Sequence, residues 1–215
     1  VQDEYPFSVC EDFVTPRTEL VSAWYIMQTR KRENHVSVYQ HYLNCCNALG
    51  ISNIREALDR MMVVDYLIVN EDRHQNNFGV LRNADTLQWL GAAPIFDSGT
   101  SLWFESPVGM IQPAAPKQPC KPFKTSHSEQ IKLVTSFDWV NLSALHGIDE
   151  EFREIVKGSP FIEPARCDAL CTALRRRVEM LAEVIQKHVK YTAVSDWSSE
   201  VRTDVAYSGD EEPER

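Results

Sequence analysis

Apolar residues recur at helical spacing through the first third of the chain. The spacing predicts helices over residues 18–32 and 36–49, because apolar side chains three or four residues apart share one face of a helix. Gly50 ends the second of these, and Ser52 is placed to cap a third helix. The apolar stripe of this third helix becomes continuous toward Val69, which is typical of a helix that enters a core.

Shorter apolar runs between turn residues predict strands. Residues 78–81 and 87–90 flank the sequence Asn-Ala-Asp and predict a β-hairpin. A third run, 94–96, predicts a short strand that stops at Asp97. The loosely alternating residues 5–9 predict a further strand, which leads into an acidic connector.

The second half of the chain begins with a long loop and ends with helices. Residues 98–127 contain five prolines and no sustained period, and loops of that length are often functional. Helical patterns return over 128–136 and 149–157, and a long helix is predicted from Pro164 to about Lys190. The predicted fold class is therefore α+β, mostly α-helical, with a small β-hairpin.

Composition and charge exclude several classes of protein. Of the 215 residues, 43% are hydrophobic, which suffices for a buried core. The net charge of −9 argues against binding to nucleic acid or to an anionic membrane, because both favour clustered Lys and Arg. No apolar stretch approaches roughly eighteen residues, no segment has the pattern of a signal peptide, and the cysteines form no Cys-x-x-Cys pair. We therefore predict a cytoplasmic protein with reduced thiols.

Two charged segments are interpreted as solvated. Residues 195–215 carry seven acidic residues against two arginines and few large apolar side chains, which predicts a disordered tail. Arg175, Arg176 and Arg177 occupy consecutive helical positions and so point in different directions, which favours a solvated face over a basic patch.

One loop carries residue types suited to phosphoryl transfer. That reaction needs a carboxylate to orient the acceptor hydroxyl and oxygen ligands for Mg²⁺ on the phosphates. Asp72 and Asn77 are five residues apart on a non-helical loop and can converge on one small volume. Asp97 precedes Ser-Gly, a small and flexible turn that lets its carboxylate point at a metal. Asp, Asn, Arg and His are common in loops, but the combination is specific.

The same residues carry a resemblance to a known family. The sequence Asp-Arg-His-Gln-Asn-Asn-Phe-Gly at 72–79, followed by Pro-Ile-Phe-Asp-Ser-Gly at 94–99, resembles the C-terminal lobe of HipA-like kinases. Phosphatidylinositol kinases share the order Asp-Arg-His-x-x-Asn. The resemblance implies a protein-kinase-like C-terminal lobe that uses ATP and Mg²⁺. It also implies a protein substrate carrying Ser or Thr, often within a toxin–antitoxin pair, and hence an antitoxin partner.

By motif position, the resemblance assigns roles to individual residues. Asp72 and His74 would be catalytic, Asp72 as the base and His74 as a support for the loop. Asn77 and Asp97 would bind the metal. The segment that ends Glu11-Asp12-Phe13 resembles the hinge between kinase lobes, whose backbone would contact adenine.

This comparison divides the chain and leaves alternatives open. Residues 1–13 correspond to the end of the N-terminal lobe and the hinge, 14–194 to the C-terminal kinase lobe, and 195–215 to the acidic tail. The lysine and the phosphate-covering loop of an N-terminal lobe do not precede Phe13, so we expect this chain to be inactive alone. It is a fragment, a split kinase completed by a partner lobe, or a remnant, and we favour a fragment or a remnant. A non-catalytic interaction module and a phosphatidylinositol-kinase-like lipid kinase are the alternative functions.

One lysine cluster also has two interpretations. Lys117, Lys121 and Lys124 are interleaved with prolines in the loop after Asp97. They could bind phosphate or a peptide substrate, or they could be solvated charges.

Overall fold

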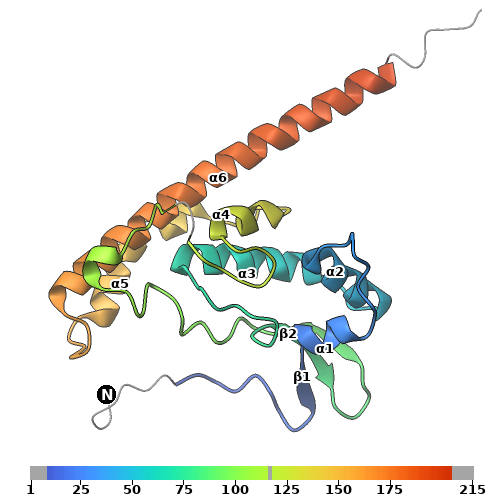
Figure 1. Cartoon of the computed structure of the whole chain (residues 1–215), viewed down its shortest axis with the longest axis horizontal. Coiled ribbons are helices and arrows are strands. Elements are labelled where there is room, and N and C mark those ends of the chain that lie inside the picture. Colours follow the sequence, from blue (N-terminus) through green and yellow to red (C-terminus); the bar gives the residue numbers. More distant parts are fainter. Residues whose placement is uncertain (1–8, 116–117, 205–215) are drawn as a thin grey trace, which may run out of the picture.

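The computed structural model describes residues 9–115 and 118–204, with side chains up to residue 190. A bundle of helices packs beside a three-stranded antiparallel sheet (Figure 1), which agrees with the predicted α+β class. The strands are β1 (Thr18–Ser22), β2 (Gly79–Asn83) and β3 (Trp89–Ala92), in the order β1-β2-β3. The predicted β-hairpin is confirmed as β2 and β3.

The prediction of a helix from Thr18 was wrong over its first residues. Residues 18–22 form β1, and only Ala23–Gln28 form a helix, α1. Leu20 and Val21 pair with Leu81 and Val80 of β2, which lie far along the sequence. Helical spacing alone did not reveal this pairing, because tertiary context overrides local pattern.

The buried core lies between α2 (Val38–Ala48), α3 (Ile54–Ile68) and the inner face of the sheet. The start of α3 differs from the prediction, because its N-cap is Asn53 in the left-handed conformation and not Ser52. At the other end, α3 stops at Val69, which has a φ of 54°. A β-branched residue in this region is strained, and here it turns the chain sharply from the helix into the loop that begins at Asn70.

The C-terminal half consists of α4 (His127–Gln130), α5 (Ile148–Val156) and the long α6 (Pro164–Asp204), joined by loops. The loops contain three short 3₁₀ helices: η1 (Val108–Met110), η2 (Ile131–Leu133) and η3 (Leu142–Leu145).

Helix α6 crosses the molecule and continues beyond the body (Figure 1), so it is longer than the predicted helix to Lys190. The backbone of residues 195–204, the first part of the expected tail, belongs to this helix, and residues 205–215 lie outside the described part. No described helix is long and apolar enough to cross a membrane.

The interpretation of Arg177 as solvated was wrong. Its side chain is buried, and its guanidinium stacks 3.7 Å from the ring centroid of Tyr66. Its Nε donates to the Tyr66 carbonyl at 2.9 Å, and its Nη1 donates to the Pro113 carbonyl at 3.2 Å. Arg177 therefore connects α6 to the C-terminal turn of α3 and to the long loop.

A glycine at the start of β2 provides a test of this sheet. A Cβ on Gly79 would lie 2.8 Å from Ser22 Cα and even closer to the Val21 carbonyl, both in the backbone of β1. We expect Gly79→Ala to lower the free energy of unfolding by about 1–3 kcal/mol, as measured by urea denaturation, because backbone cannot move aside cheaply. Gly109→Ala is the control, because a Cβ there meets nothing within 4 Å. Equal stability of the two variants would contradict the close approach of β1 to Gly79.

Candidate functional site

Arg73 forms a buried ion pair with Asp65 on α3. Both side chains are 0% exposed. Arg73 Nε and Nη2 each donate to a different carboxylate oxygen of Asp65, both at 2.9 Å. The two parallel hydrogen bonds fix the orientation of the guanidinium group and also strengthen the ion pair.

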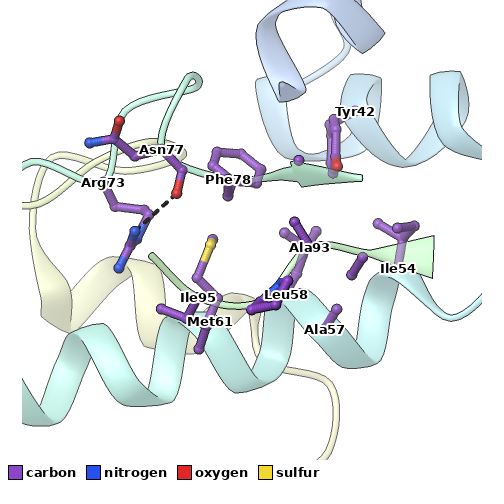
Figure 2. A pocket seen from close by; sticks show the side chains of 13 residues that line it. Tyr42, Ile54, Ala57, Leu58, Met61, Arg73, Asn77, Phe78, Ala93 and Ile95 are labelled. Carbon is purple, nitrogen blue, oxygen red and sulfur yellow. Dashed lines mark hydrogen bonds between the residues drawn. The ribbon is translucent and has the colours of Figure 1, made fainter. Parts of the chain in front are cut away.

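The remaining donors of Arg73 bind two segments that are distant in sequence. Nη1 donates to the Asn77 carbonyl at 3.0 Å, as Figure 2 shows, and also to the Phe96 carbonyl. Nη2 donates to Ser98 Oγ at 2.9 Å. Arg73 therefore fixes the loop that carries Asp72 and Asn77 against the segment that carries Asp97.

Asn70 makes a second connection between the same segments. Its Nδ2 donates to Asp65 Oδ1 at 3.0 Å. Its Oδ1 accepts from the Asp72 backbone N–H at 3.2 Å and from Thr100 Oγ1 at 2.9 Å. The buried Asn70 side chain thus sets the position of the backbone at Asp72.

The loop from Asp72 to Asn77 is a compact turn. The His74 N–H donates to the Asp72 carbonyl at 2.7 Å, and the Asn77 N–H donates to the His74 carbonyl at 2.8 Å. Asn77 Nδ2 also donates to the Asp72 carbonyl, at 3.2 Å, and His74 Nδ1 accepts from the Asn76 N–H at 3.3 Å. Asp72, His74 and Asn77 are therefore brought together, and His74 lies within the turn.

The outer side of this turn is attached to the start of α1. Ser22 Oγ donates to Asn76 Oδ1 at 2.9 Å, and the Trp24 N–H donates to the Gln75 carbonyl at 3.0 Å. The strand that was wrongly predicted as helix, β1, therefore ends beside the candidate loop.

Asp97 does not follow a strand. Residues 93–99 have no regular structure, so the prediction of a strand over 94–96 was wrong. Asp97 itself has a φ of 51° and is exposed. Aspartate tolerates this left-handed conformation better than most residues do.

Asp72 has a cationic partner from the long loop. Lys121 Nζ lies 2.5 Å from Asp72 Oδ1, and the two side chains are 57% and 39% exposed. A pair this exposed is worth at most about 1 kcal/mol, so an incoming ligand can displace it readily.

The predicted hinge residues lie at the surface. Glu11 and Asp12 are exposed, and Asp12 Oδ1 accepts from the Val14 N–H at 2.8 Å. The ring of Phe13 packs 5.4 Å from that of Phe96, immediately before Asp97. Phe13 therefore contacts the segment that leads to Asp97.

The oxygen donors present suit a hard cation. The Asn77 amide is oriented by donating its Nδ2 to the Asp72 carbonyl, which leaves its Oδ1 as a ligand atom. The carboxylate of Asp97 is exposed to solvent. Carboxylate and amide oxygens, completed by phosphate oxygens and water, are what Mg²⁺ takes in nucleotide sites. Among the described residues no three His, Cys, Asp or Glu side chains cluster to bind a metal by themselves.

A small cavity lies behind the loop (Figure 2). It has a volume of about 30 Å³ and is lined mainly by apolar side chains of α3 and of the segment 92–95 at the end of β3, together with Tyr42, Phe78, Arg73 and Asn77. A cavity of this size holds about one water molecule and cannot accommodate a nucleotide. It therefore belongs to the packing under the site.

Comparisons with known proteins bear on the fold. No protein-family model matches the chain, and no curated protein matches it in sequence. Among solved structures, it is similar to the crystal structure of a Helicobacter pylori proinflammatory kinase, CtkA, with a TM-score of 0.58 and 21% sequence identity. The match covers 86% of this chain and 76% of that one. The fold is kinase-like. This agrees with the fold that the HipA-like motifs imply.

Three contributors to the site were not identified from the sequence. Asp65 and Asn70 hold Arg73 and Asp72, and His127 lies behind them. A signal existed for Asp65, because a carboxylate within an apolar helical stripe requires a buried partner. For His127, which lies far along the chain, no local signal existed.

His127 predicts how stability depends on pH. The ring is 2% exposed. Burial, and then the nearby Arg177 guanidinium, lower the pKa of His127 to about 3, and a hydrogen bond with the Asn70 backbone opposes this only in part. The unfolded chain takes up this proton below about pH 6.5, whereas the folded chain does so only near pH 3.

The free energy of unfolding should therefore fall as the pH drops from about 6.5 toward 3, by up to roughly 1.4 kcal/mol per pH unit from His127. In His127→Phe this contribution is absent, so the slope of stability against pH should be shallower. Urea denaturation between pH 6.5 and 4.5 measures it. His35→Asn, at an exposed histidine, should keep the wild-type slope. An unchanged slope in His127→Phe would contradict the buried neutral ring.

The Arg73–Asp65 pair predicts strong coupling in stability. Arg73→Met and Asp65→Leu should each lower the free energy of unfolding by about 3–5 kcal/mol, because each leaves an uncompensated charge buried. The double variant should cost less than the sum of the two. The control is Arg60→Met, which removes an exposed partner of Glu56 and should cost less than about 1 kcal/mol. If Arg73→Met costs no more than this control, the buried pair does not hold the loop.

Proposed function

We propose that this chain is the lobe of an ATP-dependent protein Ser/Thr kinase, related to HipA-like kinases, that orients the acceptor and holds the metal. The observation that carries the proposal is the connection through Arg73 of two sequence-distant segments, one bearing Asp72 and Asn77 and the other Asp97. The kinase-like fold supports it.

In this proposal, the role of each site residue follows from its position. Asp72 lies in a half-exposed turn, where its carboxylate can accept the proton of an acceptor hydroxyl. His74 holds the shape of this turn through its backbone and its Nδ1. Asn77 and Asp97 would hold Mg²⁺, which neutralises charge on the phosphates of bound ATP.

Nucleotide binding in this proposal involves the segment before β1. The backbone of residues 11–13 would contact adenine, and the packing of Phe13 on Phe96 supports its position near Asp97. The phosphate-binding lysine and loop of an N-terminal lobe would complete the site, supplied either by the same protein or by a partner.

Substitution of the two carboxylates tests this proposal. In the complete protein, Asp72→Asn should reduce phosphate transfer from ATP by about 10²- to 10⁴-fold, because general-base catalysis contributes that much. Asp97→Asn should abolish transfer and, unlike Asp72→Asn, should weaken Mg²⁺-dependent ATP binding. Transfer of radiolabelled phosphate to protein, and separately to phosphoinositide vesicles, measures activity and distinguishes a protein kinase from a lipid kinase.

Asp85→Asn, in the exposed β2–β3 turn, is the matched control and should retain wild-type activity. Full activity in Asp72→Asn and Asp97→Asn would contradict the proposal. Absence of transfer in the wild-type complete protein would instead favour the non-catalytic alternative.

A further inference from the structure

A groove opens beside the candidate base. It has a volume of about 370 Å³ and runs from α1, past the Asp72–Asn77 turn, to the long loop. Its lining residues are Trp24, His74, Gln75, Asn76, Lys121 and Pro122. Since Lys121 reaches Asp72 Oδ1 at 2.5 Å, the groove adjoins the carboxylate that the proposed function assigns as base.

The groove is lined by one cationic side chain, Lys121, in a chain whose net charge is −9. In the absence of a ligand, the ammonium group of Lys121 is paired with Asp72 at the edge of the groove. When an acceptor hydroxyl displaces Lys121 from Asp72, the exposed ammonium group remains at the groove and is available to pair with an anionic side chain of the incoming segment. The exposed pair is weak enough for this exchange.

The position of Lys121 is fixed by a buried side chain. Gln130 is 1% exposed, and its Nε2 donates to the Lys121 carbonyl at 2.7 Å. Its Oε1 accepts from the backbone N–H groups of Phe123 and Lys124 at 3.0 and 3.2 Å. The lysine is therefore held at the groove by its backbone, although its side chain is free to change partners.

The groove also has features suited to a polypeptide. Trp24 is 48% exposed on one wall, which gives an aromatic surface for a side chain or for backbone. Gln75 and Asn76 supply amide groups that can hydrogen-bond to peptide groups.

We propose that this groove binds the acceptor segment of a protein substrate, and that Lys121 selects a segment in which acidic residues flank the Ser or Thr. The inference rests on the proposed function, since it names the substrate of the same site. Lys121 is then the residue that determines specificity.

Peptide binding tests the inference without requiring catalysis. The probes are a fluorescent decapeptide with one serine followed by three glutamates and a matched peptide with three lysines in their place. Anisotropy at low ionic strength should show that the wild-type protein prefers the acidic peptide by roughly five-fold. Lys121→Glu should invert this preference, and Trp24→Ala should weaken both peptides alike.

Lys132→Glu is the matched control, because it makes the same change in net charge on η2, at a different groove. It should keep the wild-type preference. The inference is overturned if neither peptide binds, or if Lys121→Glu and Lys132→Glu have the same preference.

Phosphate transfer separates this inference from the proposed function. An inverted preference in Lys121→Glu without transfer to either peptide would support the groove and contradict the kinase activity. Equal phosphate transfer to the acidic and the basic peptide would support the kinase activity and contradict the proposed role of the groove in substrate selection.

Discussion

The buried guanidinium of Arg73 is the group on which the candidate site depends. An arginine removed from water needs a carboxylate for its charge and acceptors for its N–H groups. Arg73 finds the carboxylate on α3 and the other acceptors on two loops, at Asn77 and around Phe96 and Ser98. Because the buried Arg73 must keep all of these partners, it holds the two loops in a defined position relative to each other.

A second buried arginine supports the same region from outside. Arg177 of α6 holds the carbonyl of Tyr66 and stacks on its ring, one helical turn before the strained Val69. His127 of α4 packs its ring edge-on against that of Tyr66 and forms a hydrogen bond with the backbone of Asn70. The turn from α3 into the loop at Asn70 is therefore supported from α4 and α6. This explains how a β-branched residue persists in the left-handed conformation.

The sequence predicted what depends on local pattern. The β2–β3 hairpin, the helix α2 that ends before Gly50 and the compact turn from Asp72 to Asn77 all involve residues close together in the chain. The strand β1 was not predictable in this way, because its partner β2 lies beyond three intervening helices. The contact of Lys121 with Asp72 is also non-local, and only the fold creates it.

Two observations underlie the roles proposed for the site residues: the kinase-like fold and the set of oxygen ligands in the site. The kinase-like fold is shared with the Helicobacter pylori structure at 21% identity, and at this level the likeness concerns fold alone. The chemical argument is the donor set, in which the Asn77 amide and the Asp97 carboxylate offer oxygen atoms and Arg73 fixes the backbone beside both.

The most direct test is a crystal structure of the complete protein with an ATP analogue and Mn²⁺ in place of Mg²⁺. Mn²⁺ prefers the same oxygen ligands and is located by its anomalous scattering. The account predicts a manganese peak bonded to Asn77 Oδ1 and to the Asp97 carboxylate, at about 2.0–2.3 Å, with Arg73 still paired to Asp65. A nucleotide-bound metal held by other residues, or a site in which Arg73 has left Asp65, would contradict it.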